Sequence, residues 1–136
     1  MQGLHLTADL RGCAAGRPAM TELAALRAAC LAAVEAAGLT PVGELFHRFE
    51  PAARPGAGAP VGITGVVLLA ESHLAVHTWP EVGAATLDVY VCNFGRDNSA
   101  RAQALLASLV ALFEPAQVER HALPRGTPAA VPDPPQ

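Results

Sequence analysis

Residues 63–92 read ITGVVLLAESHLAVHTWPEVGAATLDVYVC and contain the pattern that decides the fold. Ile63–Ala70 is an unbroken apolar run, too short for a typical helix and rich in β-branched residues, so we predict a buried strand. His73–Thr78 and Ala85–Cys92 each alternate between polar and apolar residues. Because a turn-forming segment separates them, they predict an antiparallel hairpin.

Alternation along this hairpin sorts its side chains onto the two faces of a sheet. We expect the turn to be centred near Val82 and Gly83. One face then carries His73, Ala75, His77, Asp88, Tyr90 and Cys92. The opposite face carries Leu74, Val76, Leu87, Val89 and Val91. The second set is apolar throughout, so we expect that face to lie against the core.

The chain before this region predicts two strands and a helix. Gly3–Leu10 alternates as a first strand, and Pro41–Phe49 is a second, less regular one. Between them, apolar residues recur at helical spacing in the Ala-rich segment Glu22–Ala37. We expect Thr21 to cap the start of this helix and Gly38 to end it.

The chain after the hairpin predicts one more helix and one more strand. Asp97 can cap the helix, and Pro115 ends it. Its apolar stripe consists of Ala102, Leu105, Leu106, Leu109, Leu112 and Phe113. Gln117–Leu123 alternates as a final strand. The Pro/Gly-rich segment Glu50–Pro60 predicts a mobile excursion, either a lid or a tolerated insertion.

We summarise the element order as β-α-β-β-β-α-β. It predicts an α+β two-layer sandwich, in which a mainly antiparallel sheet carries two helices on one face. Residues 1–123 are expected to form a single domain, and residues 124–136, with five prolines, a disordered tail. The second face of the sheet needs a cover. Since 51% of the residues are hydrophobic, a partner subunit is a sensible candidate.

Charge and composition exclude several kinds of partner. A net charge of −3 gives no electrostatic footprint for nucleic acid or an acidic membrane surface. The start of the chain lacks a charged segment followed by an apolar one, and no apolar run approaches a membrane span, so we expect a cytoplasmic protein. The three cysteines are odd in number and share no metal-type spacing, which favours reduced thiols over disulfides.

Residues 71–92 gather reactive side chains that permit three interpretations. A serine or cysteine beside an imidazole, such as Ser72 with His73 or His77, is the arrangement of an activated nucleophile. His73, His77 and Cys92 on one face would suffice for a metal site, although their spacing matches no known ligand motif. Alternatively, these histidines are simply solvated or hydrogen-bonded on a polar face.

Three strings in this region carry a resemblance to a known family: Glu71-Ser72-His73, His77-Thr78-Trp79-Pro80-Glu81 and Leu87-Asp88-Val89-Tyr90-Val91-Cys92. They resemble the prokaryotic S-adenosylmethionine decarboxylase proenzymes, a pyruvoyl-dependent family with an α+β sandwich and active sites near a dimer interface. Further similar stretches are His5-Leu6 with Asp9, and Phe46-His47-Arg48-Phe49. The resemblance covers Gly3 to about Leu123.

This resemblance implies that the chain is cleaved by its own residues. Ser72 would attack the carbonyl of Glu71, and elimination would then split the protein into a β chain, 1–71, and an α chain, 72–136. The α chain would begin with a pyruvoyl group derived from Ser72. That group would form a Schiff base with the substrate amine and accept the electrons released with carbon dioxide, so neither a metal nor pyridoxal phosphate is expected.

The resemblance also implies roles for five other residues. His77 would assist processing as a base, Cys92 would return a proton to the substrate, and the Thr64 hydroxyl would steer processing through hydrogen bonding. Glu81 would bind ribose hydroxyls, and Phe49 would be a platform for adenine. Cys92 as a small buried residue is a rival interpretation. The expected assembly is a homodimer of cleaved αβ protomers that acts on S-adenosylmethionine for polyamine synthesis.

Three departures from the family pattern concern the substrate. Leu10 and Val82 stand where aromatic or charged residues are common in relatives, and the segment Glu50–Pro60 is longer than usual. A smaller amine is therefore conceivable, with L-arginine or L-ornithine decarboxylation as the alternative function. Its pocket would need an added carboxylate, for which the candidates are Asp9, Glu44 and Glu50. A further alternative is a non-enzymatic paralogue that binds or regulates.

Overall fold

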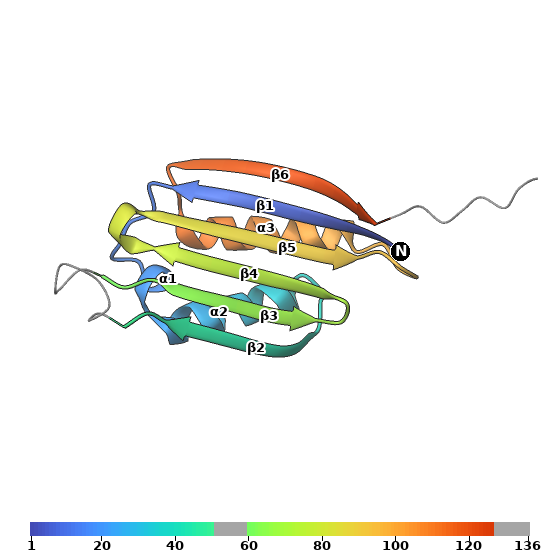
Figure 1. The fold of residues 1–136 in the computed structure, drawn as a ribbon, viewed down its shortest axis with the longest axis horizontal. Coiled ribbons are helices and arrows are strands. Elements are labelled where there is room, and N and C mark those ends of the chain that lie inside the picture. The colour runs from blue at the N-terminus through green and yellow to red at the C-terminus, as the bar shows by residue number, and fades with distance from the viewer. Residues whose placement is uncertain (51–59, 127–136) are drawn as a thin grey trace, which may run out of the picture.

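The computed structural model describes residues 1–50 and 60–126, and these form one sheet with helices on one of its faces (Figure 1). The elements are β1 (Gln2–Arg11), α1 (Pro18–Thr21), α2 (Leu23–Ala36), β2 (Pro41–Arg48), β3 (Ile63–Leu69), β4 (Ser72–Trp79), η2 (Pro80–Val82), β5 (Ala84–Cys92), α3 (Ser99–Phe113) and β6 (Gln117–Gly126). The predicted α+β two-layer sandwich is confirmed. Of the excursion predicted for Glu50–Pro60, residues 51–59 lie outside the described residues.

The sheet has the strand order β2-β3-β4-β5-β1-β6, and each neighbouring pair is antiparallel. The four strands between α2 and α3 correspond to the four segments predicted individually, and the summary order β-α-β-β-β-α-β omits one of them. β1 lies between β5 and β6, which brings the two ends of the described chain together in one half of the sheet (Figure 1).

The central hairpin has the predicted faces with a shifted register. His73 pairs with Tyr90, so the turn is centred between Glu81 and Val82, one residue earlier than predicted. The short 3-10 helix η2 and Gly83, at φ 63°, close this turn. Because the pairing shifts by two residues, each side chain keeps its face. The five apolar side chains assigned to the core are all fully buried.

β3 is not buried on both faces, which corrects the sequence prediction. Ile63, Val67 and Leu69 face the helices and are buried. Val66 is half-buried and Leu68 is 51% exposed, because no helix covers their side of the sheet. An apolar run hides this difference, since both faces carry aliphatic residues.

The helix starts differ from the predicted caps. Thr21 is not an N-cap but the last residue of the short helix α1, which the sequence analysis missed; Glu22 precedes α2 instead. Gly38, at φ 78°, ends α2 as predicted, with its N–H bonded to the Glu35 carbonyl. Asp97 is the predicted N-cap of α3, but the observed N-cap is the next residue, Asn98.

The core lies between the helices and the inner face of the sheet. In α3 the predicted stripe is buried except for Leu112, which is half-buried, while Val110 is buried in addition. Thr78 is a buried polar residue in this layer. Its hydroxyl accepts a hydrogen bond from the Ile63 N–H and donates one to the Met20 carbonyl, both at 2.9 Å. It thereby joins β3 and β4 to α1.

The final strand β6 extends to Gly126, three residues beyond the predicted Leu123. Pro124 is tolerated because β6 is an edge strand that pairs only with β1. The remainder of the predicted tail, 127–136, lies outside the described residues.

The face of the sheet away from the helices is open and mixed in character. The chain has five histidines, and the strand registers place all of them on this open face: His5, His47, His73, His77 and His121. Exposed leucines lie among them, with Leu45 76% and Leu123 48% exposed. This mixture is typical of a surface that contacts another protein.

Candidate active site

Ser72 is the first residue of β4 and follows a two-residue turn, Ala70-Glu71. Glu71 has φ 54°, a left-handed conformation that a non-glycine residue adopts at a cost of roughly 1–2 kcal/mol. The Ser72 Oγ accepts a hydrogen bond of 3.0 Å from the Cys92 backbone N–H. The predicted cleavage bond therefore joins a strained residue to a serine whose oxygen is held in place.

Cys92 ends β5 beside Ser72 and is 8% exposed. Sequence alternation predicts the open face for Cys92, but Cys92 is buried, and its backbone carbonyl accepts a hydrogen bond from Asn98 in the following loop. A small cavity of about 150 Å³ lies at this end of the sheet. Its lining is Gly38, Leu39, Thr40, Leu69, Ala70, Ser72, Arg96 and Asn98.

Thr64 and His77 form a second cluster on the open face. The Thr64 Oγ1 and the His77 Nδ1 are hydrogen-bonded at 3.0 Å across the paired strands β3 and β4. The His77 ring stacks on Trp79, with ring centroids 5.9 Å apart. Trp79 thus supports the imidazole, a contact that the sequence analysis did not assign.

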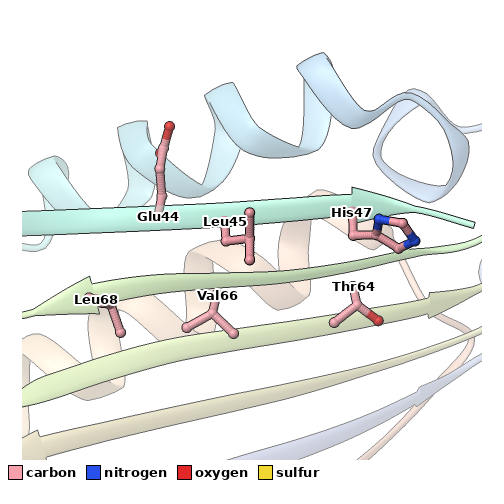
Figure 2. Close-up of a pocket in the computed structure, with 6 residues that line it drawn as sticks. All are labelled: Glu44, Leu45, His47, Thr64, Val66 and Leu68. Atoms are coloured by element: carbon pink, nitrogen blue, oxygen red, sulfur yellow. The ribbon is translucent and has the colours of Figure 1, made fainter.

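A cavity of about 330 Å³ adjoins this cluster and is shown in Figure 2. Its lining is Glu44, Leu45, His47, Thr64, Val66 and Leu68, from β2 and β3. His47 and Leu68 were missed as site residues. Alternation in β2 and β3 was the available signal, because it places them on the same face as Thr64.

Phe49 and Glu81 lie toward the same end of the sheet as Thr64 and His77. Phe49 follows β2, where its N–H donates to the Gly62 carbonyl at 3.1 Å and its ring meets the His47 ring edge-on at 5.4 Å. Glu81 is exposed in η2, directly after β4. Phe49 thus contacts His47, a residue of the cavity lining, whereas Glu81 is not among the lining residues.

The predicted site residues thus fall into two groups at opposite ends of the sheet. Ser72, Glu71 and Cys92 lie at the end that carries the β3–β4 turn, here called the serine end. Thr64 and His77, with Phe49 and Glu81, lie at the histidine end. Ser72 and His77 are five positions apart along β4, which is about 16 Å at roughly 3.3 Å per residue. One chain does not bring these two side chains together.

The carboxylates considered for an amino-acid pocket differ in their surroundings. Glu44 points toward the helix layer, where it forms an ion pair with Arg27 of α2 (Figure 2). The ion pair uses the Oε1 of Glu44, while its Oε2 is buried without a hydrogen-bond partner among the described residues. Asp9 and Glu50 are exposed.

The three cysteines are free and buried. Burial raises the pKa of the Cys30 thiol to about 12. Burial also raises the pKa of Cys13, although the nearby Arg17 acts in the opposite direction. Cys13 and Cys30 are therefore protonated at neutral pH, unlike a reactive thiolate.

Residues 1–50 and 60–126 contain neither a candidate metal centre nor a helix that could span a membrane. In that part of the chain, His, Cys, Asp and Glu side chains do not gather in threes around a point that could hold a metal ion, so His73, His77 and Cys92 do not form a metal site. Within the same residues, the helices are too short or too polar to cross a membrane.

Comparison with known proteins places the chain in a class of decarboxylases. The sequence profile described as S-adenosylmethionine decarboxylase matches residues 4–126. The chain therefore belongs to the S-adenosylmethionine decarboxylase family, which confirms the resemblance found in the sequence.

Individual relatives agree with this assignment. The S-adenosylmethionine decarboxylase proenzyme of Parasynechococcus marenigrum is 38% identical over 136 residues, covering 98% of this chain and 92% of that protein. The proenzyme of Aquifex aeolicus is 35% identical over 124 residues, covering 91% and 81%. The crystal structure of the adenosylmethionine decarboxylase from Aquifex aeolicus VF5 matches with a TM-score of 0.80 at 31% identity, covering 97% of both chains.

Proposed function

We propose that this chain is a self-cleaving, pyruvoyl-dependent decarboxylase that acts on S-adenosylmethionine and supplies polyamine synthesis. The observation that carries the proposal is the serine end, where Ser72 follows a residue at φ 54° and its Oγ is held by the Cys92 N–H. The related proteins named proenzymes support it, because that name denotes a precursor. Buried free thiols suit a reducing compartment, the cytoplasm.

Cleavage proceeds in two balanced steps from Ser72. In the first, Oγ bonds to the Glu71 carbonyl carbon, the peptide C–N bond breaks, and the hydroxyl proton passes to the freed nitrogen. In the second, a base takes the Ser72 α-proton, the Cβ–Oγ bond breaks, and its electron pair leaves with the Glu71 carboxylate. The product is a dehydroalanine, an enamine whose Cβ takes up a proton to give an imine. Water then hydrolyses the imine and releases ammonia. The left-handed Glu71 favours the first step, because breaking the peptide bond relieves its strain.

The group formed from Ser72 supplies a carbonyl that takes up the substrate amine and accepts electrons as carbon dioxide leaves. This chemistry needs neither a metal nor pyridoxal phosphate. Cys92 lies beside the group, where its thiol can return a proton to the substrate carbon.

His77 suits the base of the elimination step if its Nδ1–H donates to the Thr64 hydroxyl. The Nε2 lone pair is then free to accept a proton. The contact with Thr64 fixes the orientation of the ring, and Trp79 supports the ring from one side.

This base must come from a second copy of the chain. About 16 Å of strand separates His77 from Ser72 in one chain, beyond any proton transfer. A two-fold dimer solves the problem, because the histidine end of one sheet then lies against the serine end of the other. The open face, with its histidines and exposed leucines, suits such an interface.

The cavity of Figure 2 is the proposed place of the adenosyl group. The cavity extends along β2 and β3 from His47 and Thr64 to Leu68. In the proposed site Phe49 is a ring for the adenine and Glu81 a carboxylate for the ribose hydroxyls. An arginine or ornithine pocket is less suitable, because the Glu44 carboxylate is paired with Arg27.

Intact-mass measurement of purified protein tests cleavage. We expect two fragments, 1–71 and 72–136, the second starting with a pyruvoyl group, and a single uncleaved chain for Ser72→Ala. A wild-type chain that stays whole, or a Ser72→Ala variant that is cleaved, would overturn the proposal. Carbon dioxide release from S-adenosylmethionine, arginine and ornithine, assayed side by side, identifies the substrate. A cleaved protein that decarboxylates none of them but binds one would favour a binding or regulatory paralogue.

A further inference from the structure

The Cys92 backbone is held by an amide side chain from the loop that precedes α3. The Asn98 Nδ2 donates a hydrogen bond of 2.9 Å to the Cys92 carbonyl. Asn98 also lines the cavity that Ser72 lines. The Asn98 backbone N–H donates to the Asn93 Oδ1 at 2.8 Å. The side chain and the backbone of Asn98 are therefore both held by residues at the end of β5 and the start of the loop.

This contact breaks a local rule of helix structure. An asparagine in the N-cap position ordinarily turns its side-chain oxygen back to an N–H of the first turn. Asn98 makes no such cap, although it is the N-cap of α3. Asp97, one residue earlier, bonds the Ser99 N–H at 2.9 Å instead. Departures of this kind cluster at functional sites, where a side chain is needed elsewhere.

We infer that Asn98 is a positioning residue for chain cleavage, and this inference rests on the proposed function. Asn98 fixes the Cys92 carbonyl at the end of β5, and the fixed Cys92 presents its N–H to the Ser72 Oγ. The N–H acts on the reacting oxygen in both steps. It orients Oγ for attack on the Glu71 carbonyl, and it stabilises the negative charge that Oγ acquires when the Cβ–Oγ bond breaks.

Asn98 belongs to none of the sequence motifs, and neither the family match nor the relatives' names assign it a role. The inference depends on two observed hydrogen bonds in series and on the missing cap. The adjacent Arg96 lines the same cavity but is exposed, so we assign it no part.

Two substitutions of Asn98 distinguish an effect on the positioning of Ser72 from an effect on the stability of the fold. Asn98→Asp and Asn98→Ser both lose the hydrogen bond to the Cys92 carbonyl, but either side chain can instead cap α3, and Asp also complements the helix dipole. Both variants are therefore expected to unfold near the wild-type temperature. Asp lacks the donor, and Ser is too short to reach the Cys92 carbonyl. We expect both variants to cleave roughly tenfold more slowly, the order expected for the loss of one positioning hydrogen bond.

The measurement is a time course of fragment formation in cell-free synthesis, run beside thermal unfolding of the same variants in the Ser72→Ala background. Asp97→Ala is the matched control, because it removes a hydrogen bond in the same loop without contacting Cys92. For Asn98→Asp, the rate relative to wild type should rise as the pH falls toward about 4, since a protonated Asp regains a donor.

Slow cleavage with retained stability in both Asn98 variants, and a normal rate in Asp97→Ala, would support the inference. Wild-type cleavage rates in both Asn98 variants would overturn it while leaving the proposed function intact. The inference would also be overturned if the cleavage rates of Asn98→Asp, Asn98→Ser and Asp97→Ala fell only in proportion to their loss of stability. A wild-type chain that is never cleaved would instead remove the proposed function itself.

Discussion

The two ends of the sheet hold their reactive groups by different means. At the serine end, a backbone N–H and a strained turn fix Ser72, so the geometry depends on the course of the main chain. At the histidine end, a side-chain pair, Thr64 with His77, lies on the open face of the regular strands β3 and β4. In the proposed mechanism the serine end is changed by cleavage, and the histidine end presents a base to the second copy of the chain.

The strongest test of this division mixes two inactive chains. His77→Ala alone should slow cleavage by about 10²- to 10⁴-fold through loss of the base, and Ser72→Ala cannot be cleaved. When the two variants are co-expressed, the His77→Ala chain should be cut, because its partner supplies His77.

Differently tagged chains and intact masses identify which one is cut. The matched control is co-expression of two differently tagged copies of His77→Ala, which should both stay uncut. If the mixture also stays uncut while mixed dimers are present, the base does not come from the partner, and the two-copy site is wrong.

The core beneath the histidine end offers a second test. Thr78→Val removes the hydroxyl that bonds the Ile63 N–H and the Met20 carbonyl, leaving both groups unpaired in the core. We expect the free energy of unfolding to fall by about 1–3 kcal/mol, measured by urea denaturation in the Ser72→Ala background. Thr86→Val, on the open face, is the control and should change stability much less. Equal effects would mean that the Thr78 bonds are unimportant.

The Thr64–His77 pair itself should matter less than the imidazole. Thr64→Val keeps the shape of the side chain but removes the hydroxyl, so we expect cleavage about tenfold slower. Thr64→Ser should cleave near the wild-type rate, since it retains the hydroxyl. The time course of fragment formation measures both. Identical rates for the Val and Ser variants would show that the hydroxyl does not orient His77.

The smallest predicted effect lies at the serine end. Glu71→Gly makes the φ of 54° nearly free of cost, and the relieved strain of roughly 1 kcal/mol should slow cleavage about fivefold. Ala70→Gly, the neighbouring substitution, should have little effect of this kind. Cleavage of Glu71→Gly at or above the wild-type rate would exclude strain as a contribution to the first step.

Much of the fold could be read from the sequence because one face of each central strand is apolar. The alternation from Leu74 to Val91 fixed the faces of the hairpin even though its turn was placed one residue late. The same logic failed for β3, where Val66 and Leu68 are apolar on the open face as well. It also missed α1, since a four-residue helix has no periodicity to detect.

The identities of the candidate residues came from motifs, but their arrangement did not. The five-residue spacing of Ser72 and His77 already implied two distant positions on an extended strand, and that signal was available. The contacts of Asn98 and Trp79 could not be predicted from the sequence, because they depend on how loops and strands meet in space.

The strand order has a consequence for the fate of the molecule after cleavage. A cut after Glu71 would leave β1 in one fragment, hydrogen-bonded on both sides to β5 and β6 of the other. Strands of the two fragments would thus be interleaved in one sheet, and the fragments could not dissociate without unfolding. Folding must therefore precede cutting. Once the mature protein is denatured, its refolding becomes a bimolecular event whose rate depends on concentration, whereas the uncut chain refolds alone.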